Sequence, residues 1–181
     1  MLLILIAVVL IGVWAVAAFN GLVQLRVRSD NAWSDISVQL KRRYDLIPNL
    51  VETVKGYAGH EQKVFIQVTE ARSRAMQADG PKEKEAAEGM LTGALKSLFA
   101  VAENYPQLRA SENFMGLQKS LSEIEEALQN ARRYYNAVVR DYNTKLEVFP
   151  DRLVAGAGGF KAKEFFQLGS EEEAKAPKVA F

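Results

Sequence analysis

The stretch that decides the fold is FMGLQKSLSEIEEALQNARRYYNAVVRDY, residues 114–142. Its apolar and aromatic side chains are spaced by alternating steps of three and four residues, a seven-residue repeat typical of a helix that packs along one seam. They are Phe114, Leu117, Leu121, Ile124, Leu128, Ala131, Tyr135, Val138 and Tyr142. Ser111 is a good N-cap residue and Pro150 a natural stop, so we expect one long helix between them.

The same spacing recurs in three earlier segments of the chain. They cover residues 33–58, 64–75 and 87–105. The turn signal Asp79-Gly80-Pro81 separates the last two, so we expect two shorter helices over 60–78 and 82–104. Each helix has one apolar stripe that needs a partner, which predicts an all-α fold with an antiparallel four-helix bundle over residues 24–150.

The N-terminal segment MLLILIAVVLIGVWAVAAFNGLV, residues 1–23, contains no charged side chain. As a helix it is roughly 34 Å long, which is enough to cross a hydrocarbon core of about 30 Å. The alternative is a cleaved signal peptide, because Ala15-Val16-Ala17 fits a cleavage site. However, no Lys or Arg precedes the apolar run and the run continues to Val23, so we expect a transmembrane anchor that is retained.

The anchor and the body share one helix in this prediction, since no turn signal separates residue 23 from the stripe that follows. Pro48 lies inside this helix, and we expect a local bend there. Cationic residues follow the apolar run at Arg26, Arg28 and 41–43. Positive charge tends to stay in the cytoplasm, so the body is predicted to be cytoplasmic and the N-terminus to lie outside.

The composition argues against several classes of function. Lys and Arg total 23 and Asp and Glu 22, which does not suggest a nucleic-acid-binding protein. There is no cysteine, and His60-Glu61 lacks the second histidine of a zinc-protease motif because Val64 takes its place. The glycine-rich residues 156–159 lack the lysine of a nucleotide-binding loop. We therefore expect no enzyme, no catalytic residue, no cofactor, no metal and no small-molecule substrate.

Residues 38–61 carry the most unusual helix surface, with the cationic run Lys41-Arg42-Arg43. The run lies roughly 27–30 Å of helix from the span, beyond a Debye length of about 8–10 Å, so a protein partner is a better use for it than lipid headgroups. A solvated helix face is the alternative. The candidate partner-binding residues are Arg42, Arg43, Asp45, Asn49 and His60.

Two further expectations concern the last helix and the residues after it. Asn136 and Asn143 lie seven residues apart beside the seam, and we expect them to form a polar layer with a flank of the first helix. That flank carries Asp45, Asn49 and Glu52. Residues 151–181 are predicted to form an irregular Gly/Phe-rich segment, whose phenylalanines cover the bundle end or touch lipid, and a disordered acidic tail.

Four sequence blocks resemble the LemA family of bacterial membrane proteins. They are AWSDISVQLKRRYDLIPNLVETVKGYAGHE (32–61), ENYPQLRASENFMGLQ (103–118), ARRYYNAVVRDYN (131–143) and FP before AGAGGF (149–160). The resemblance covers nearly the whole chain, except the residues after Leu168. It implies a four-helix bundle on one membrane span, a bacterial inner-membrane location and no defined reaction.

The function that we predict is a membrane-anchored, non-enzymatic scaffold or docking module. Its partners would be the lipid bilayer, through residues 1–23, and either a second copy of the chain or another membrane protein. Two alternatives remain open at this point. One is an accessory subunit of a membrane enzyme whose site needs a partner chain, and the other is a secreted bundle released by cleavage after Ala17.

Overall fold

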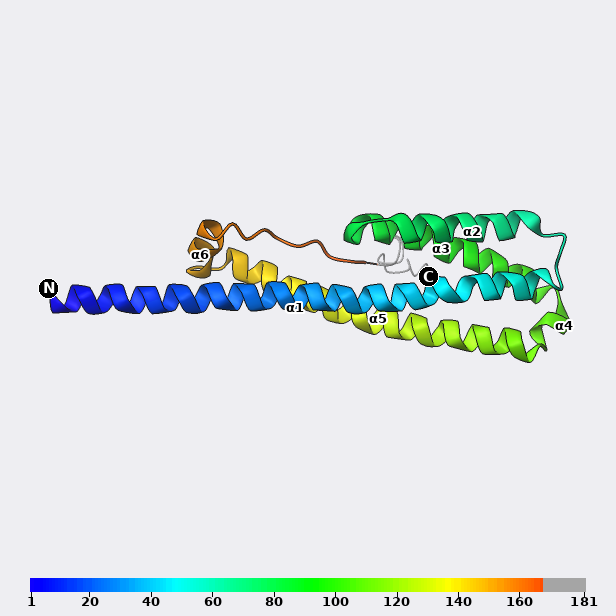
Figure 1. The fold of residues 1–181 in the computed structure, drawn as a ribbon, viewed down its shortest axis with the longest axis horizontal. Coiled ribbons are helices and arrows are strands. Elements are labelled where there is room, and N and C mark those ends of the chain that lie inside the picture. The colour runs from blue at the N-terminus through cyan, green and yellow to red at the C-terminus, as the bar shows by residue number, and fades with distance from the viewer. Residues whose placement is uncertain (168–181) are drawn as a thin grey trace, which may run out of the picture. The chain divides into compact units, whose positions relative to one another are not determined.

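The computed structural model of the chain describes residues 1–167, and every regular element in that range is helical. The helices are α1 (Leu2–Lys55), α2 (Gln62–Gln77), α3 (Gly80–Glu103), α4 (Pro106–Arg109), α5 (Glu112–Glu147) and α6 (Asp151–Ala157) (Figure 1). The prediction of an all-α fold is therefore confirmed. The predicted disordered tail lies almost wholly outside the described residues.

Helix α1 is continuous from Leu2 to Lys55, so the expectation that one helix runs on from the apolar segment is confirmed. Pro48 lies inside it, and the bend expected there stays a prediction. The boundary between α2 and α3 falls at the predicted turn. Asp79 accepts a hydrogen bond from the Gly80 backbone N–H at 2.9 Å, and Gly80 has a φ of +71°, a conformation that favours glycine.

The chain divides into two compact units, and α1 and α5 contribute residues to both. Unit 1 comprises Met1–Ile36 and Asn130–Phe165. Unit 2 comprises Ser37–Gln129 together with Phe166 and Gln167 among the described residues. The division of the chain into residues 1–23, 24–150 and 151–181 was based on composition, and it stays a prediction.

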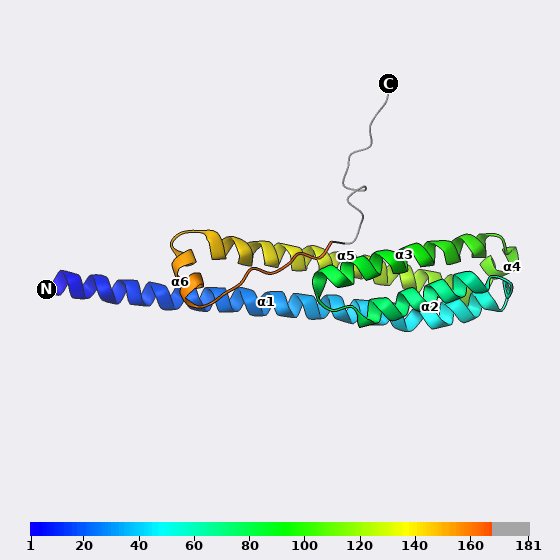
Figure 2. The ribbon, with the colours of Figure 1, turned by 90° about the horizontal axis from the view of Figure 1, so that it is seen from above.

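Unit 2 has an apolar core built by α2, α3, the end of α1 and the start of α5. Helices α2 and α3 lie side by side in both views (Figures 1 and 2). Its most deeply buried side chains include Leu40, Ile47, Val54, Val68, Leu91, Leu98, Leu108 and Leu128. These residues fall on the stripes expected from the sequence, apart from Leu108 in the short helix α4, which the sequence pattern did not predict.

Unit 1 has a smaller core at the end of α5. Leu22, Tyr142 and Ala155 are buried there, and Val154 and Phe160 pack against them. The segment after Pro150 was predicted to be irregular, and this prediction was wrong for residues 151–157. They form α6, because its apolar residues find a face of α1 to pack against, and the irregular segment begins only at Gly158.

The first turns of α1 expose apolar side chains to their surroundings. The large exposed residues there include Leu2, Leu3, Ile4, Leu5, Val8, Leu10 and Ile11. Among the described helices, α1 is the one that is long and apolar enough to cross a membrane. Almost none of its most apolar window is buried within the protein.

Candidate functional site

The most concentrated group of charges in unit 2 surrounds Arg43 of α1. Its side chain is 2% exposed, and its Nη1 donates to Oε2 of Glu88 in α3, which is fully buried, at 2.6 Å. Nη2 donates to the Thr92 hydroxyl at 3.1 Å. Nε lies 2.8 Å from a carboxylate oxygen of Glu125 in α5, an ion pair without hydrogen-bond geometry. One arginine thus connects α1, α3 and α5.

Tyr44, the next residue of α1, extends the cluster to α2. Its hydroxyl donates to Oε1 of Glu88 and lies 3.2 Å from the backbone oxygen of Ala75. Its own backbone oxygen accepts from Arg72 Nε at 2.7 Å. Lys84 Nζ lies 5.8 Å from the centre of the Tyr44 ring, within range of a cation–π contact. We call the group of Arg43, Tyr44, Glu88 and Glu125 the arginine cluster.

The electrostatics of the arginine cluster favour a neutral Tyr44 phenol. Burial raises the pKa of Tyr44 well above its usual range, and the hydrogen bond to Glu88 and the negative charge of Glu88 act in the same direction. Arg43 opposes this shift without cancelling it. Both Glu88 oxygens accept hydrogen bonds from α1 side chains inside the protein, so the cluster holds α1 and α3 together.

A shallow groove lies between α1 and α5 on the surface of unit 2. Its volume is about 390 Å³, and it is lined by Arg42, Asp45, Leu46, Ser120, Glu123 and Ile124. Within α1, Lys41 pairs with Asp45 at 2.7 Å, and both side chains are exposed. The groove therefore presents charges of both signs around two apolar side chains. We call it the α1–α5 groove.

The five predicted partner-binding residues divide into two groups. Arg42 and Asp45 line the α1–α5 groove, Asn49 is exposed on the following turn, and His60 is exposed between α1 and α2. Arg43 does not belong to this surface, because its guanidinium is held inside unit 2 by Glu88 and Glu125. Of the three basic residues 41–43, which were expected to form a cationic surface, Lys41 and Arg42 are exposed and Arg43 is buried.

The α1 residues that were expected to join a polar layer with the last helix lie at the surface: Asp45, Asn49 and Glu52 are exposed. Asn143 instead binds the backbone of Lys163 with both ends of its amide, accepting from the N–H at 2.9 Å and donating to the carbonyl at 2.8 Å. Lys163 lies outside the helices, so its backbone N–H and carbonyl need hydrogen-bond partners from elsewhere. The Asn143 amide, which carries both a donor and an acceptor, supplies them.

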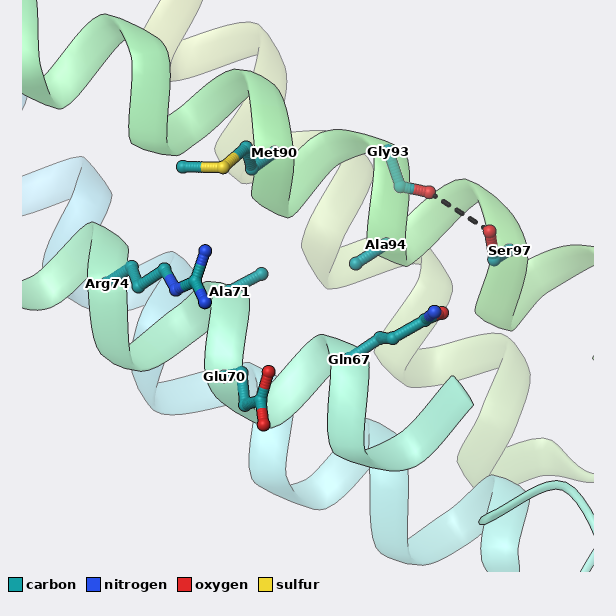
Figure 3. A pocket seen from close by; sticks show the side chains of 8 residues that line it. All are labelled: Gln67, Glu70, Ala71, Arg74, Met90, Gly93, Ala94 and Ser97. Atoms are coloured by element: carbon teal, nitrogen blue, oxygen red, sulfur yellow. Dashed lines mark hydrogen bonds between the residues drawn. The ribbon is translucent and has the colours of Figure 1, made fainter. Parts of the chain in front are cut away.

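A second groove lies between α2 and α3, with a volume of about 340 Å³ (Figure 3). It is lined by Gln67, Glu70, Ala71, Arg74, Met90, Gly93, Ala94 and Ser97. The small residues among them leave it open, and a Cβ added at Gly93 would meet no atom within 4 Å. Ser97 turns its hydroxyl back onto the Gly93 carbonyl at 3.3 Å, as Figure 3 shows.

Sequence reasoning missed Glu88, although the sequence carries a signal for it. Glu88 continues the core stripe of α3 backward from Leu91 with the same alternation of three and four residues. A charged residue at a core position is rarely buried unless it is paired, so its spacing predicts an opposite charge on another helix. The partner Arg43 lies 45 residues away, and no local pattern connects the two.

Within residues 1–167, no group of three or more His, Cys, Asp or Glu side chains is placed to hold a metal ion.

Within residues 1–167 the fold defines a helical protein with one helix that is long and apolar enough to cross a membrane. The sequence profile of the LemA family matches residues 32–181, and the chain belongs to this family. Magnetosome protein MamQ 2 of Paramagnetospirillum magneticum is 26% identical, over 89% of this chain and 72% of the relative. Protein LemA of Metamycoplasma hominis is 27% identical, over 75% and 63% respectively. The resemblance inferred from the four sequence blocks is thereby confirmed.

Proposed function

We propose that this chain is a non-enzymatic helical protein that is anchored in a membrane through residues 1–23 and acts as a scaffold or docking module. One observation carries the proposal. The same continuous helix α1 exposes apolar side chains over its first turns and contributes core residues to unit 2 over its last turns. Exposed apolar surface of this extent is costly in water and favourable in lipid.

The four long helical segments are proposed to form an antiparallel four-helix bundle. The arginine cluster supports this arrangement, since Arg43 contacts carboxylates of α3 and α5 and Arg72 of α2 contacts the backbone of Tyr44. Helices α2 and α3 are joined by only two residues, which favours neighbours that run in opposite directions.

The location that we propose is the inner membrane of a bacterium, with a single pass and the body in the cytoplasm. Arg26 and Arg28 follow the apolar segment. Positive charge on this flank supports a cytoplasmic body and an N-terminus outside the cytoplasm.

The docking surface is proposed to be the α1–α5 groove together with Asn49. Arg42, Asp45 and Glu123 offer both signs of charge, and Leu46 and Ile124 supply apolar contact. Such a mixture suits a protein helix better than a lipid headgroup or a nucleic acid, which would need an excess of cations. The partner is either a second copy of this chain or another membrane protein.

A photo-crosslinking amino acid placed at Asp45 or Asn49 of the full chain tests this proposal in native membranes. We expect a discrete crosslinked species, which mass spectrometry assigns to a second copy or to another protein. Lys96 is a matched control, because it is an exposed residue of α3 that lines neither groove. If positions 45 and 49 crosslink no more than position 96, the proposed docking surface is wrong.

A further inference from the structure

The corner between α5 and α6 exposes large apolar side chains next to the apolar part of α1. Phe149 is 81% exposed and Leu153 is 63% exposed, and Val148 is also exposed. The end of α5, all of α6 and the first turns of α1 belong to unit 1, so the contacts among them lie within one compact unit.

Contacts within unit 1 determine which turns of α1 lie beside this corner. An apolar groove of about 510 Å³ is lined on one side by Ala15, Val16 and Phe19 of α1. On the other side it is lined by Leu153, Val154, Ala157 and Gly158. Helix α6 is seen beside α1 in both views (Figures 1 and 2).

Phe160, which follows α6, also packs against α1. Its ring meets that of Phe19 edge to face, with 5.3 Å between the centroids, and Arg26 lies 5.4 Å from its centre. Gly158 is required for this packing, because a Cβ there would come within 2.6 Å of the Phe160 ring. The position of α6 against α1 is thus held by specific contacts.

Helix geometry then places the corner at the depth of the bilayer. Phe19 follows Leu2 by 17 residues, or about 26 Å of helix, while a hydrocarbon core is about 30 Å thick. If residues 1–23 cross the membrane, Ala15 and Phe19 lie within its apolar region. Residues that pack against them reach the same region or the interface just beyond it.

The chemistry of the corner suits the boundary between headgroups and acyl chains. The backbone N–H groups of Val148, Arg152 and Leu153 donate to carbonyls within residues 144–150, and Pro150 has no N–H. These intrachain hydrogen bonds lower the cost of placing this part of the backbone against lipid. The charged side chains of Asp151 and Arg152 oppose deeper insertion of the corner into the bilayer. Arg152 is exposed, and its long side chain can extend to the headgroups.

We propose that the corner Val148–Leu153 is a second membrane-contact element, which inserts Phe149 and Leu153 among the acyl chains at the bilayer surface beside the anchor. The occupant of the apolar groove is lipid, because the groove is continuous with the apolar surface of the span. This inference rests on the proposed anchoring by residues 1–23. It adds that the end of α5 and helix α6 lie at the same membrane surface as the anchor.

Single-cysteine variants of the full chain test the proposal, and the absence of natural cysteine makes them direct. Phe149→Cys and Leu153→Cys are labelled with an environment-sensitive fluorophore and reconstituted in phosphatidylcholine/phosphatidylglycerol vesicles. We expect a blue shift and strong quenching by lipids that carry a quencher high on the acyl chain. Tyr134→Cys is the matched control, because it is 52% exposed on α5 in the same unit and is expected to show neither effect.

Leu10→Cys separates this inference from the proposed anchor. Its label is expected to be quenched most strongly by quenchers placed deep in the acyl chain. If position 10 is quenched while positions 149 and 153 behave like position 134, the second contact is wrong and the anchor stands. If position 10 is not quenched, the anchor and the second contact both fall.

Discussion

Arg43 in α1 and Glu88 in α3 form an ion pair of 2.6 Å in the interior of unit 2, although 45 residues separate them in the sequence. Neither side chain is accessible to water to any useful extent. A buried pair contributes little over a well-packed apolar pair, but loss of one partner leaves the other charge without compensation. The pair therefore specifies which helix faces contact one another more than it adds net stability.

Replacement of Arg43 by methionine is expected to lower the free energy of unfolding by roughly 3–5 kcal/mol, because Glu88 stays buried and loses its cation. Urea titration of the full chain in detergent, followed by helical circular dichroism, measures the change. Lys41→Met is the matched control, since its ion pair with Asp45 is exposed and worth about 0–1 kcal/mol. The double variant Arg43→Met/Glu88→Met should recover part of the loss. Equal effects at positions 41 and 43 would contradict this account.

Tyr135 provides a prediction for alkaline pH. Burial, reinforced by the charges of Asp30 and Glu164, raises its pKa to about 12, while an unfolded tyrosine ionises near 10. The folded state thus holds the phenol in its neutral form. Its contribution to stability is fully present below pH about 10 and is lost as the pH rises through about 12, with a total of at most about 2–3 kcal/mol.

A comparison of Tyr135→Phe with the parent chain measures this contribution. The variant should lose less stability between pH 9 and 12, because it has no phenol to ionise. Tyr134→Phe changes the exposed neighbour and should leave the alkaline loss as it is in the parent chain. Parallel pH profiles for the parent and Tyr135→Phe would show that the Tyr135 phenol is not protected in the folded state.

Asn143→Ala is expected to release the segment that follows α6. Two hydrogen bonds to the Lys163 backbone disappear, each worth about 0.5–1.5 kcal/mol, while the Tyr135 hydroxyl still donates to the Glu164 carbonyl. Hydrogen exchange should therefore rise in residues 160–167 and stay unchanged in the middle of α5. Asn130→Ala, at an exposed position of the same helix, is the control. Unchanged exchange in the Asn143 variant would show that the segment is held by its other contacts, such as the hydrogen bond from Tyr135, without Asn143.

Much of the fold follows from the spacing of apolar residues, because burial of one stripe per helix depends on local sequence. Tyr44, Ile47 and Leu91 were expected in the core for this reason and are buried there. The turn at Asp79-Gly80-Pro81, where α3 begins, also follows from local chemistry. Helix α6 could not be predicted in this way, because its seven residues are too few to show a helical period and its order depends on packing against α1.

The site was less predictable than the fold. Arg43 was interpreted as part of a cationic surface, since three consecutive basic residues usually face water. Its pairing with Glu88 depends on which faces of α1 and α3 meet, and this relation is not encoded in either local segment. Asn143 was likewise assigned a helix–helix role that a backbone segment twenty residues later fulfils.

The retention of the apolar segment as a membrane anchor is the central claim, and the mass and location of the mature chain test it most directly. Membranes washed with alkaline carbonate should keep the protein, and its intact mass should correspond to a chain that still contains residues 1–23. A mature protein in the soluble fraction whose first residue is Ala18 would contradict the claim and remove the basis for both membrane contacts.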